Sequence, residues 1–157
     1  MEYLAMQTMF DEAAGWGHRS YAKGGFANDL PAQVWPKLAS HLATAGPEDS
    51  FALWTQGGAI ADLSDDAMAF TGRHALFDVS ADTAWDDPAE DAQRIAWVRG
   101  AMAIVEPYFV TGRYVNEQAD SGMAESIYGG AKYQRLVALK RQWDSDNVFR
   151  LNQNIRP

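Results

Sequence analysis

Alternation of apolar and polar side chains between residues 74 and 85 is the feature that most constrains how this chain folds. Phe77, Val79 and Ala81 occupy every second position, and polar residues stand between them. Because successive side chains of a strand point to opposite faces of a sheet, the pattern predicts a strand with one apolar and one polar face. Three further segments have patterns typical of strands: residues 18–26, 50–56 and 113–116.

Segments with helical spacing separate these strands. Asp87-Pro88 starts one helix, with Asp as the cap and Pro in the first turn, and apolar residues at core spacing follow up to Val105. Further helices are predicted over residues 3–14, from Leu30 and from Gly129. The order predicts one α+β domain over residues 1–157. Its antiparallel sheet would have about four or more strands with helices on one face, in a split βαβ, ferredoxin-like arrangement.

Composition excludes several classes of function. The 157 residues carry a formal charge of −8, which argues against nucleic acid as a partner. Cysteine is absent, and His18, His41 and His74 lie too far apart for metal-ligand spacing, so we expect no metal site. No apolar run is long enough to cross a membrane and no signal peptide is apparent, so we expect a soluble cytoplasmic protein.

The polar face of the predicted sheet is a candidate binding surface. Aromatic rings mixed with ionisable and amide groups suit a small-molecule ligand or a partner domain, although an ordinary solvated face explains the pattern as well. The residues predicted to share this face are Tyr21, Lys23, Trp54, Gln56, Asp78, Ser80, Tyr114 and Asn116.

Three blocks in the last third of the chain carry a resemblance to a known family. They are Arg113-Tyr114-Val115-Asn116, the segment from Tyr128-Gly129-Gly130 to Lys140, and the segment from Trp143 to Ile155. In order and spacing they closely resemble the tail of berberine-bridge-enzyme-like oxidases, with the berberine-like part at about residues 107–157. Weaker similarity extends over nearly the whole chain.

The resemblance implies a C-terminal, substrate-side part of a two-domain flavin oxidase. In that family an N-terminal domain binds FAD, and members oxidise alcohols, sugars or alkaloid-like compounds with O2 as final acceptor. We therefore expect the 157 residues alone to bind no FAD and to be inactive, unless a separate chain supplies an FAD-binding domain. We also expect a homodimer, because the polar face would otherwise stay uncovered.

The resemblance also assigns roles to residues. Tyr114 matches a tyrosine that lies beside the substrate in several members and can act as a base. From their places on the predicted sheet face, Lys23 is the cation expected to assist Tyr114 and Asp78 is the rival base. Asn116 and Asn152 are candidate cofactor contacts. The candidate substrate contacts are Tyr21, Lys23, Trp54, Gln56 and Ser80.

Some positions depart from the family pattern. Gly72 stands where a histidine is common, Ala22 where a tryptophan is common, and Glu117 where a tyrosine is frequent. These three positions leave the substrate open. A stand-alone binding protein or cofactor-free enzyme that uses the same sheet face is the alternative. At the C-terminus, Phe149 and Leu151 are predicted to anchor the tail in the core, and Trp143 to point inward.

Overall fold

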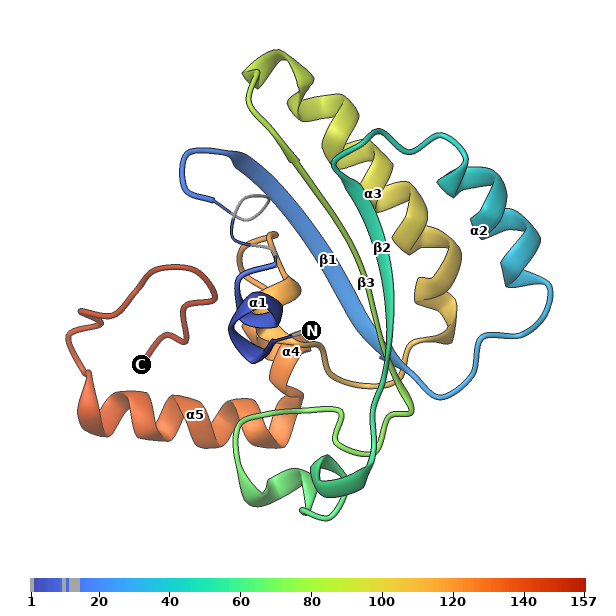
Figure 1. Cartoon of the computed structure of the whole chain (residues 1–157). Coiled ribbons are helices and arrows are strands. Elements are labelled where there is room, and N and C mark those ends of the chain that lie inside the picture. The colour runs from blue at the N-terminus through green and yellow to red at the C-terminus, as the bar shows by residue number, and fades with distance from the viewer. Residues whose placement is uncertain (1, 10, 12–14) are drawn as a thin grey trace.

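A three-stranded antiparallel sheet is the centre of the computed structural model, which describes residues 2–9, 11 and 15–157 (Figure 1). The predicted α+β class and antiparallel sheet are confirmed. Short 3₁₀ turns connect several elements. The helices and strands are α1 (Tyr3–Gln7), β1 (Arg19–Ala27), α2 (Val34–Leu42), β2 (Asp49–Thr55), β3 (Phe77–Trp85), α3 (Asp91–Val105), α4 (Ala124–Tyr128) and α5 (Gly130–Trp143).

The strand order is β1-β3-β2, so β3 lies between the other two strands and pairs antiparallel with both. Helix α2 connects β1 to β2, and the longer helix α3 follows β3. Figure 1 shows α2 and α3 on the same side of the sheet. Helix α3 packs directly on β1 and β3, whereas α2 packs on α3.

The core lies between α3 and one face of the sheet. Val98, Met102 and Val105 of α3 are fully buried there, together with Val79 and Ala81 of β3. The start of this helical segment follows the predicted capping, because the Asp87 side chain accepts a hydrogen bond of 2.9 Å from the backbone N–H of Ala89. Helical spacing therefore identified the correct apolar face of α3.

The fourth strand predicted over residues 113–116 is not formed. Residues 113 and 114 have no regular structure, and Val115–Glu117 forms a 3₁₀ turn. The segment still lies along the outer edge of β1, where Phe109 and Gln118 make isolated bridges to that strand. Between these bridges the chain turns at Gly112, with φ +92°, so it leaves the edge and cannot continue a ladder. The described residues therefore do not complete the four-stranded ferredoxin-like arrangement.

The second face of the sheet is partly covered by two loops. Phe26 of β1 points to this face and is fully buried, with the Phe70 ring packed edge-on at 5.9 Å. Gly72 lies against the same Phe26 ring, so closely that a Cβ would overlap it. Thr71 links this loop to the other one through a hydrogen bond of 3.1 Å to the carbonyl of Arg113. Side chains on both loops can therefore meet above the sheet.

Two predictions at the chain ends need correction. Helix α1 ends at Gln7, and the rest of the helix predicted up to residue 14 includes residues 10 and 12–14, which lie outside the described residues. At the C-terminus, Trp143, Phe149 and Leu151 are strongly exposed rather than buried. The Asp144 carboxylate accepts hydrogen bonds from two backbone N–H groups after it and so holds the tail in a loop outside the core.

No helix in the part of the chain that the structure describes combines the length and hydropathy needed to cross a membrane.

We expect Gly72→Ala to lower the free energy of unfolding more than Gly122→Ala, by roughly 1–3 kcal/mol. Both glycines have φ +77°, so both substitutions bring the same backbone strain. A Cβ at Gly72 would overlap the buried Phe26 ring, whereas nothing lies within 4 Å of one at Gly122. Urea unfolding of the two variants measures the difference, and equal losses would show that the contact with Phe26 is unimportant.

Candidate functional site

The pairing register of β3 decides which predicted residues share the face of the sheet that is turned away from α3. Asp78 and Ser80 point to it from β3, and Trp54 of β2 lies directly opposite Asp78. Gln56 follows Trp54 by two residues and donates its backbone N–H to the carbonyl of Leu76. Trp54 is 59% exposed, and Ser80 is buried. These four predicted residues form one surface, which we call the polar face.

Tyr21 and Lys23 do not belong to the polar face, and their predicted place there is wrong. They pair with Thr83 and Ala81 of β3, whose side chains point toward α3. The pattern from residue 18 to residue 26 alternates only loosely. It therefore predicts the opposite face of the sheet from the one on which the β1 side chains lie.

Tyr21 has a structural role on the helix-covered side. Its buried hydroxyl donates to Asp120 at 3.0 Å and accepts from Arg99 Nε at 3.0 Å. Lys23 lies 3.6 Å from the same Asp120 carboxylate. Burial acts to raise the pKa of Asp120, but hydrogen bonds from Arg99 and Tyr21 hold it below its ordinary value. Lys23 is therefore paired with Asp120 and is not the cation predicted beside Tyr114.

Tyr114 and Asn116 reach the polar face from the loop that follows α3. The Tyr114 ring packs edge-on against Phe70 at 6.0 Å, and Phe70 in turn packs on Phe26 of β1. Asn116 donates from Nδ2 to the Tyr114 hydroxyl at 2.9 Å. The three aromatic rings thus connect Tyr114 to the sheet without a fourth strand, and the amide orients its hydroxyl.

Glu117 is a site residue that the sequence did not single out as a functional group. Its carboxyl group lies over Gly24 of β1, where a Cβ would overlap it. Gly24 pairs with Ser80 of β3, so this carboxyl group lies near Ser80 and near Asp78 on the same face of the sheet. Burial, followed by the negative charge of Asp78, raises the pKa of Glu117 to about 7, and burial also raises the pKa of Asp78.

A signal for this contact was present in the sequence. Gly24 and Gly25 stand inside a predicted strand, and an interior glycine often marks close approach of another group. The Gly24 contact partner is Glu117, and that of Gly25 is the Phe109 ring. Which segment approaches the glycines cannot be read from their presence alone.

The two candidate cofactor contacts line one cavity of about 590 Å3. Asn116 borders it from the loop after α3, and Asn152 from the C-terminal tail. The neighbouring Gln153 holds the tail in place, because its Nε2 donates to the backbone carbonyls of Gln118 and Asp120 at 3.1 and 2.5 Å. The cavity therefore brings together residues far apart in the sequence.

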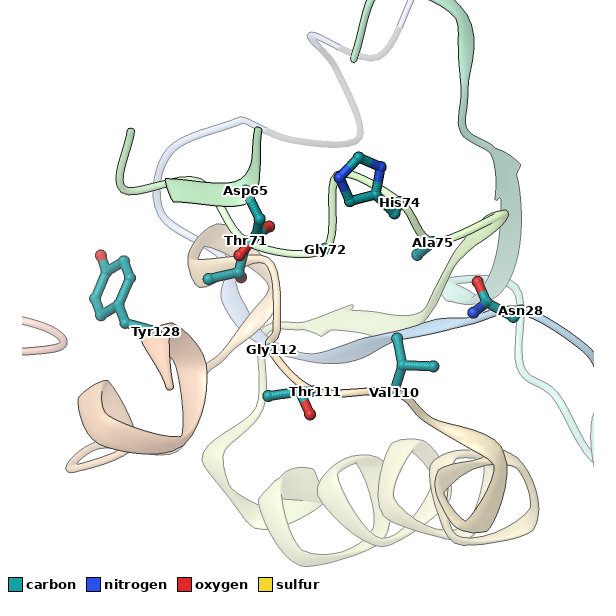
Figure 2. Close-up of a pocket in the computed structure, with 10 residues that line it drawn as sticks. All are labelled: Asn28, Asp65, Thr71, Gly72, His74, Ala75, Val110, Thr111, Gly112 and Tyr128. Atoms are coloured by element: carbon teal, nitrogen blue, oxygen red, sulfur yellow. The ribbon is translucent and has the colours of Figure 1, made fainter. Parts of the chain in front are cut away.

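A second pocket, of about 300 Å3, lies between the loop around Gly72 and the segment around Thr111 (Figure 2). Figure 2 shows Tyr128 at one end and Asn28 at the other. Asp65 on its wall is paired at 2.8 Å with the mostly buried Lys132 of α5. That ion pair fastens α5 to the loop. In the described ranges, no group of three or more acidic, histidine or cysteine residues could hold a metal ion.

Comparisons with known proteins define the class of the chain. The family described as berberine and berberine like matches residues 113–156. The FAD-linked oxidoreductase YvdP of Bacillus subtilis is 31% identical over 147 residues, which cover 92% of this chain and 31% of YvdP. The aclacinomycin oxidase of Streptomyces galilaeus is 27% identical over 67% of this chain and 23% of its own length. The matched proteins are FAD-linked oxidoreductases.

Solved structures agree with the sequence matches. The flavoenzyme CrmK of caerulomycin biosynthesis superposes with a TM-score of 0.81 at 25% identity, over 100% of this chain and 37% of CrmK. The chain belongs to the berberine-bridge-enzyme-like family of FAD-linked oxidoreductases. It spans about a third of the length of these relatives.

We expect Tyr21→Phe to lower the free energy of unfolding by about 2 kcal/mol, because a buried hydroxyl that bonds two charged groups is lost. Tyr3→Phe is the matched control, since Tyr3 is strongly exposed. Chemical unfolding of both variants measures the two losses. A Tyr21→Phe variant as stable as the control would mean that the hydroxyl is free to serve another purpose.

Proposed function

We propose that the chain is the substrate-side part of an FAD-dependent oxidoreductase that oxidises an alcohol, sugar or alkaloid-like small molecule, with O2 as final acceptor. The observation that carries the proposal is the composition of the polar face. A half-buried carboxyl pair, Asp78 and Glu117, lies beside the exposed Trp54 and near the loop that carries Tyr114. The proposed substrate contacts are Trp54, Gln56 and Ser80.

The residues present suit a flavin and its substrate. Gln56, Asp78 and Glu117 each have a buried side-chain oxygen that receives no hydrogen bond from an N–H or hydroxyl group of the described chain. Asn116 and Asn152 offer amide groups at one cavity for the cofactor. In the proposed reaction, a hydride from the substrate carbon is transferred to FAD. The other FAD contacts belong, in this proposal, to the two thirds of the relatives that the 157 residues do not span.

Asp78 is the proposed proton acceptor. A substrate hydroxyl must lose a proton as its carbon loses the hydride, so a proton acceptor is needed nearby. Burial raises the pKa of Asp78, which brings this carboxylate closer to the pKa range in which a general base works well. The cation predicted to assist Tyr114 as a base, Lys23, is paired with Asp120 on the other side of the sheet. The Tyr114 hydroxyl instead orients the substrate, with Asn116 fixing its position.

We expect Asp78→Asn to slow flavin reduction in the FAD-loaded full-length protein by roughly 10²–10⁴-fold, because a general base is lost. Tyr114→Phe, which removes one hydrogen bond, should slow it by only about tenfold. Single-turnover absorbance measurements give both rates, with the exposed Asp29→Asn as control. A larger loss in Tyr114→Phe than in Asp78→Asn would make Tyr114 the base.

The polar face also accounts for the proposed self-association of the 157-residue chain. The isolated chain should retain no flavin and should form a symmetric dimer through this face, because Trp54 is a large exposed apolar group. Trp54→Lys should then give a monomer by light scattering, whereas Trp143→Lys, on a different exposed surface, should leave the dimer intact. A dimer in both variants would place the interface elsewhere.

A further inference from the structure

Glu117 lies over the middle of the polar face. Gly24, which it contacts, pairs with Ser80 of β3, so the Glu117 carboxyl group is close to Ser80 and to its neighbours on the same face, Asp78 and Asp82. The side chains of β1 on this face are small at Ala22 and Gly24. The missing side chain at Gly24 therefore makes the room in which Glu117 reaches Asp78.

The nearby cations are engaged elsewhere. Lys23 and Arg99 both pair with Asp120 on the other side of β1. Arg113 donates to two backbone carbonyls, and Arg73 stacks over the Phe70 ring. The groups that face Glu117 are the acids Asp78 and Asp82 and the hydroxyl of Ser80 from β3, with Tyr114 on its own loop. No positive charge in these contacts balances two carboxylates.

The Asp78 and Glu117 carboxyl groups can be satisfied only if they share a proton. Oδ1 of Asp78 and Oε2 of Glu117 are both buried, and neither receives a hydrogen bond from an N–H or hydroxyl group of the described residues. A proton on one of the two carboxyl groups would let that group donate a hydrogen bond to the other. Two ionised carboxylates in this position would leave both oxygens unsatisfied and repel each other.

We propose that Glu117 is a positioning residue that joins Asp78 in a carboxyl pair with one shared proton, so that the two groups act as a single acid–base unit. The role rests on the proposed function, in which Asp78 accepts the substrate proton. With both carboxyl groups ionised, the unit takes up one proton and keeps it between the two oxygens. The singly protonated pair accepts a second proton only at a lower pH.

The direction of the pKa values agrees with this assignment. Burial and Asp78 raise the pKa of Glu117 to about 7, near the pH at which a general base combines availability with proton affinity. Asp78 alone, without Glu117, would lose the partner that holds the proton. Glu117 thereby sets the pH at which the site can accept a proton.

The direct test is a pH titration of the side-chain carboxyl carbons by ¹³C NMR on the purified chain without flavin. We expect one carboxyl group to titrate with a midpoint near 7 in the wild type. Glu117→Gln keeps the shape but removes one carboxyl group, so this midpoint should vanish, while burial should keep the pKa of Asp78 above its ordinary value of about 3.9. The control Glu48→Gln, on an exposed loop, should keep the midpoint near 7.

Gly24→Ala tests the geometry without changing either carboxyl group. The added Cβ would push Glu117 away from the sheet, so the midpoint should fall by about two units toward the ordinary glutamate value. The proposal is overturned if all carboxyl groups of the wild type titrate below pH 5, or if Glu117→Gln retains the midpoint near 7. Both outcomes are independent of flavin chemistry, so they leave the proposed oxidase function to its own test.

The wild-type chain offers a second measurement. Because the pKa of Glu117 is raised on folding, its protonated form stabilises the fold below its ordinary pKa of about 4.5, and this contribution is lost as pH rises through about 7. We expect the free energy of unfolding to fall between about pH 5 and pH 8 in the wild type and in Glu48→Gln. The fall should be smaller in Glu117→Gln, and identical pH profiles in all three proteins would contradict the shared proton.

Discussion

The antiparallel register between β1 and β3 is the constraint on which the rest of the structure depends. It pairs Gly24 with Ser80 and Phe26 with Asp78, and so sends these side chains to the polar face, while Tyr21 and Val79 point toward α3. A shift by one residue would exchange the two faces of β1. It would place Phe26 in the helix-covered core and Tyr21 on the polar face. The candidate site and the core are therefore consequences of the same set of backbone hydrogen bonds.

Two glycines let the loops come close to this sheet. Gly72 allows its loop to lie on the Phe26 ring, and Gly24 allows Glu117 to lie on β1. Both Gly72 and Glu117 depart from residues common in the family. The family's histidine at the position of Gly72 would overlap Phe26 in this structure. These departures belong to one local arrangement, in which a carboxyl pair and aromatic rings packed edge-on occupy the polar face.

The surface of the chain has apolar groups that its own core does not cover. Trp143, Phe149 and Leu151 are exposed along α5 and the tail, and Trp54 is exposed on the sheet. The relatives are about three times as long as this chain. Exposed apolar residues of this size are typical of surfaces that contact other parts of a protein or other subunits. This agrees with the proposal that the chain is one part of a larger flavin enzyme.

Local patterns in the sequence by themselves determined the three strands, the capped start of the α3 segment, the fold class and the family. Alternation, helical spacing and the Tyr128-Gly129-Gly130 block depend on neighbouring residues, so they can be read without knowing what lies across the sheet. The sequence also identified Trp54, Asp78, Ser80 and Tyr114 as residues of one side. The tertiary structure alone decided the face of Tyr21 and Lys23, the loss of the fourth strand, the exposure of Phe149 and the contact of Glu117 with Asp78. The physical reason is that strand register and loop approach join residues 39 or more positions apart, through backbone hydrogen bonds and close packing that no local pattern encodes.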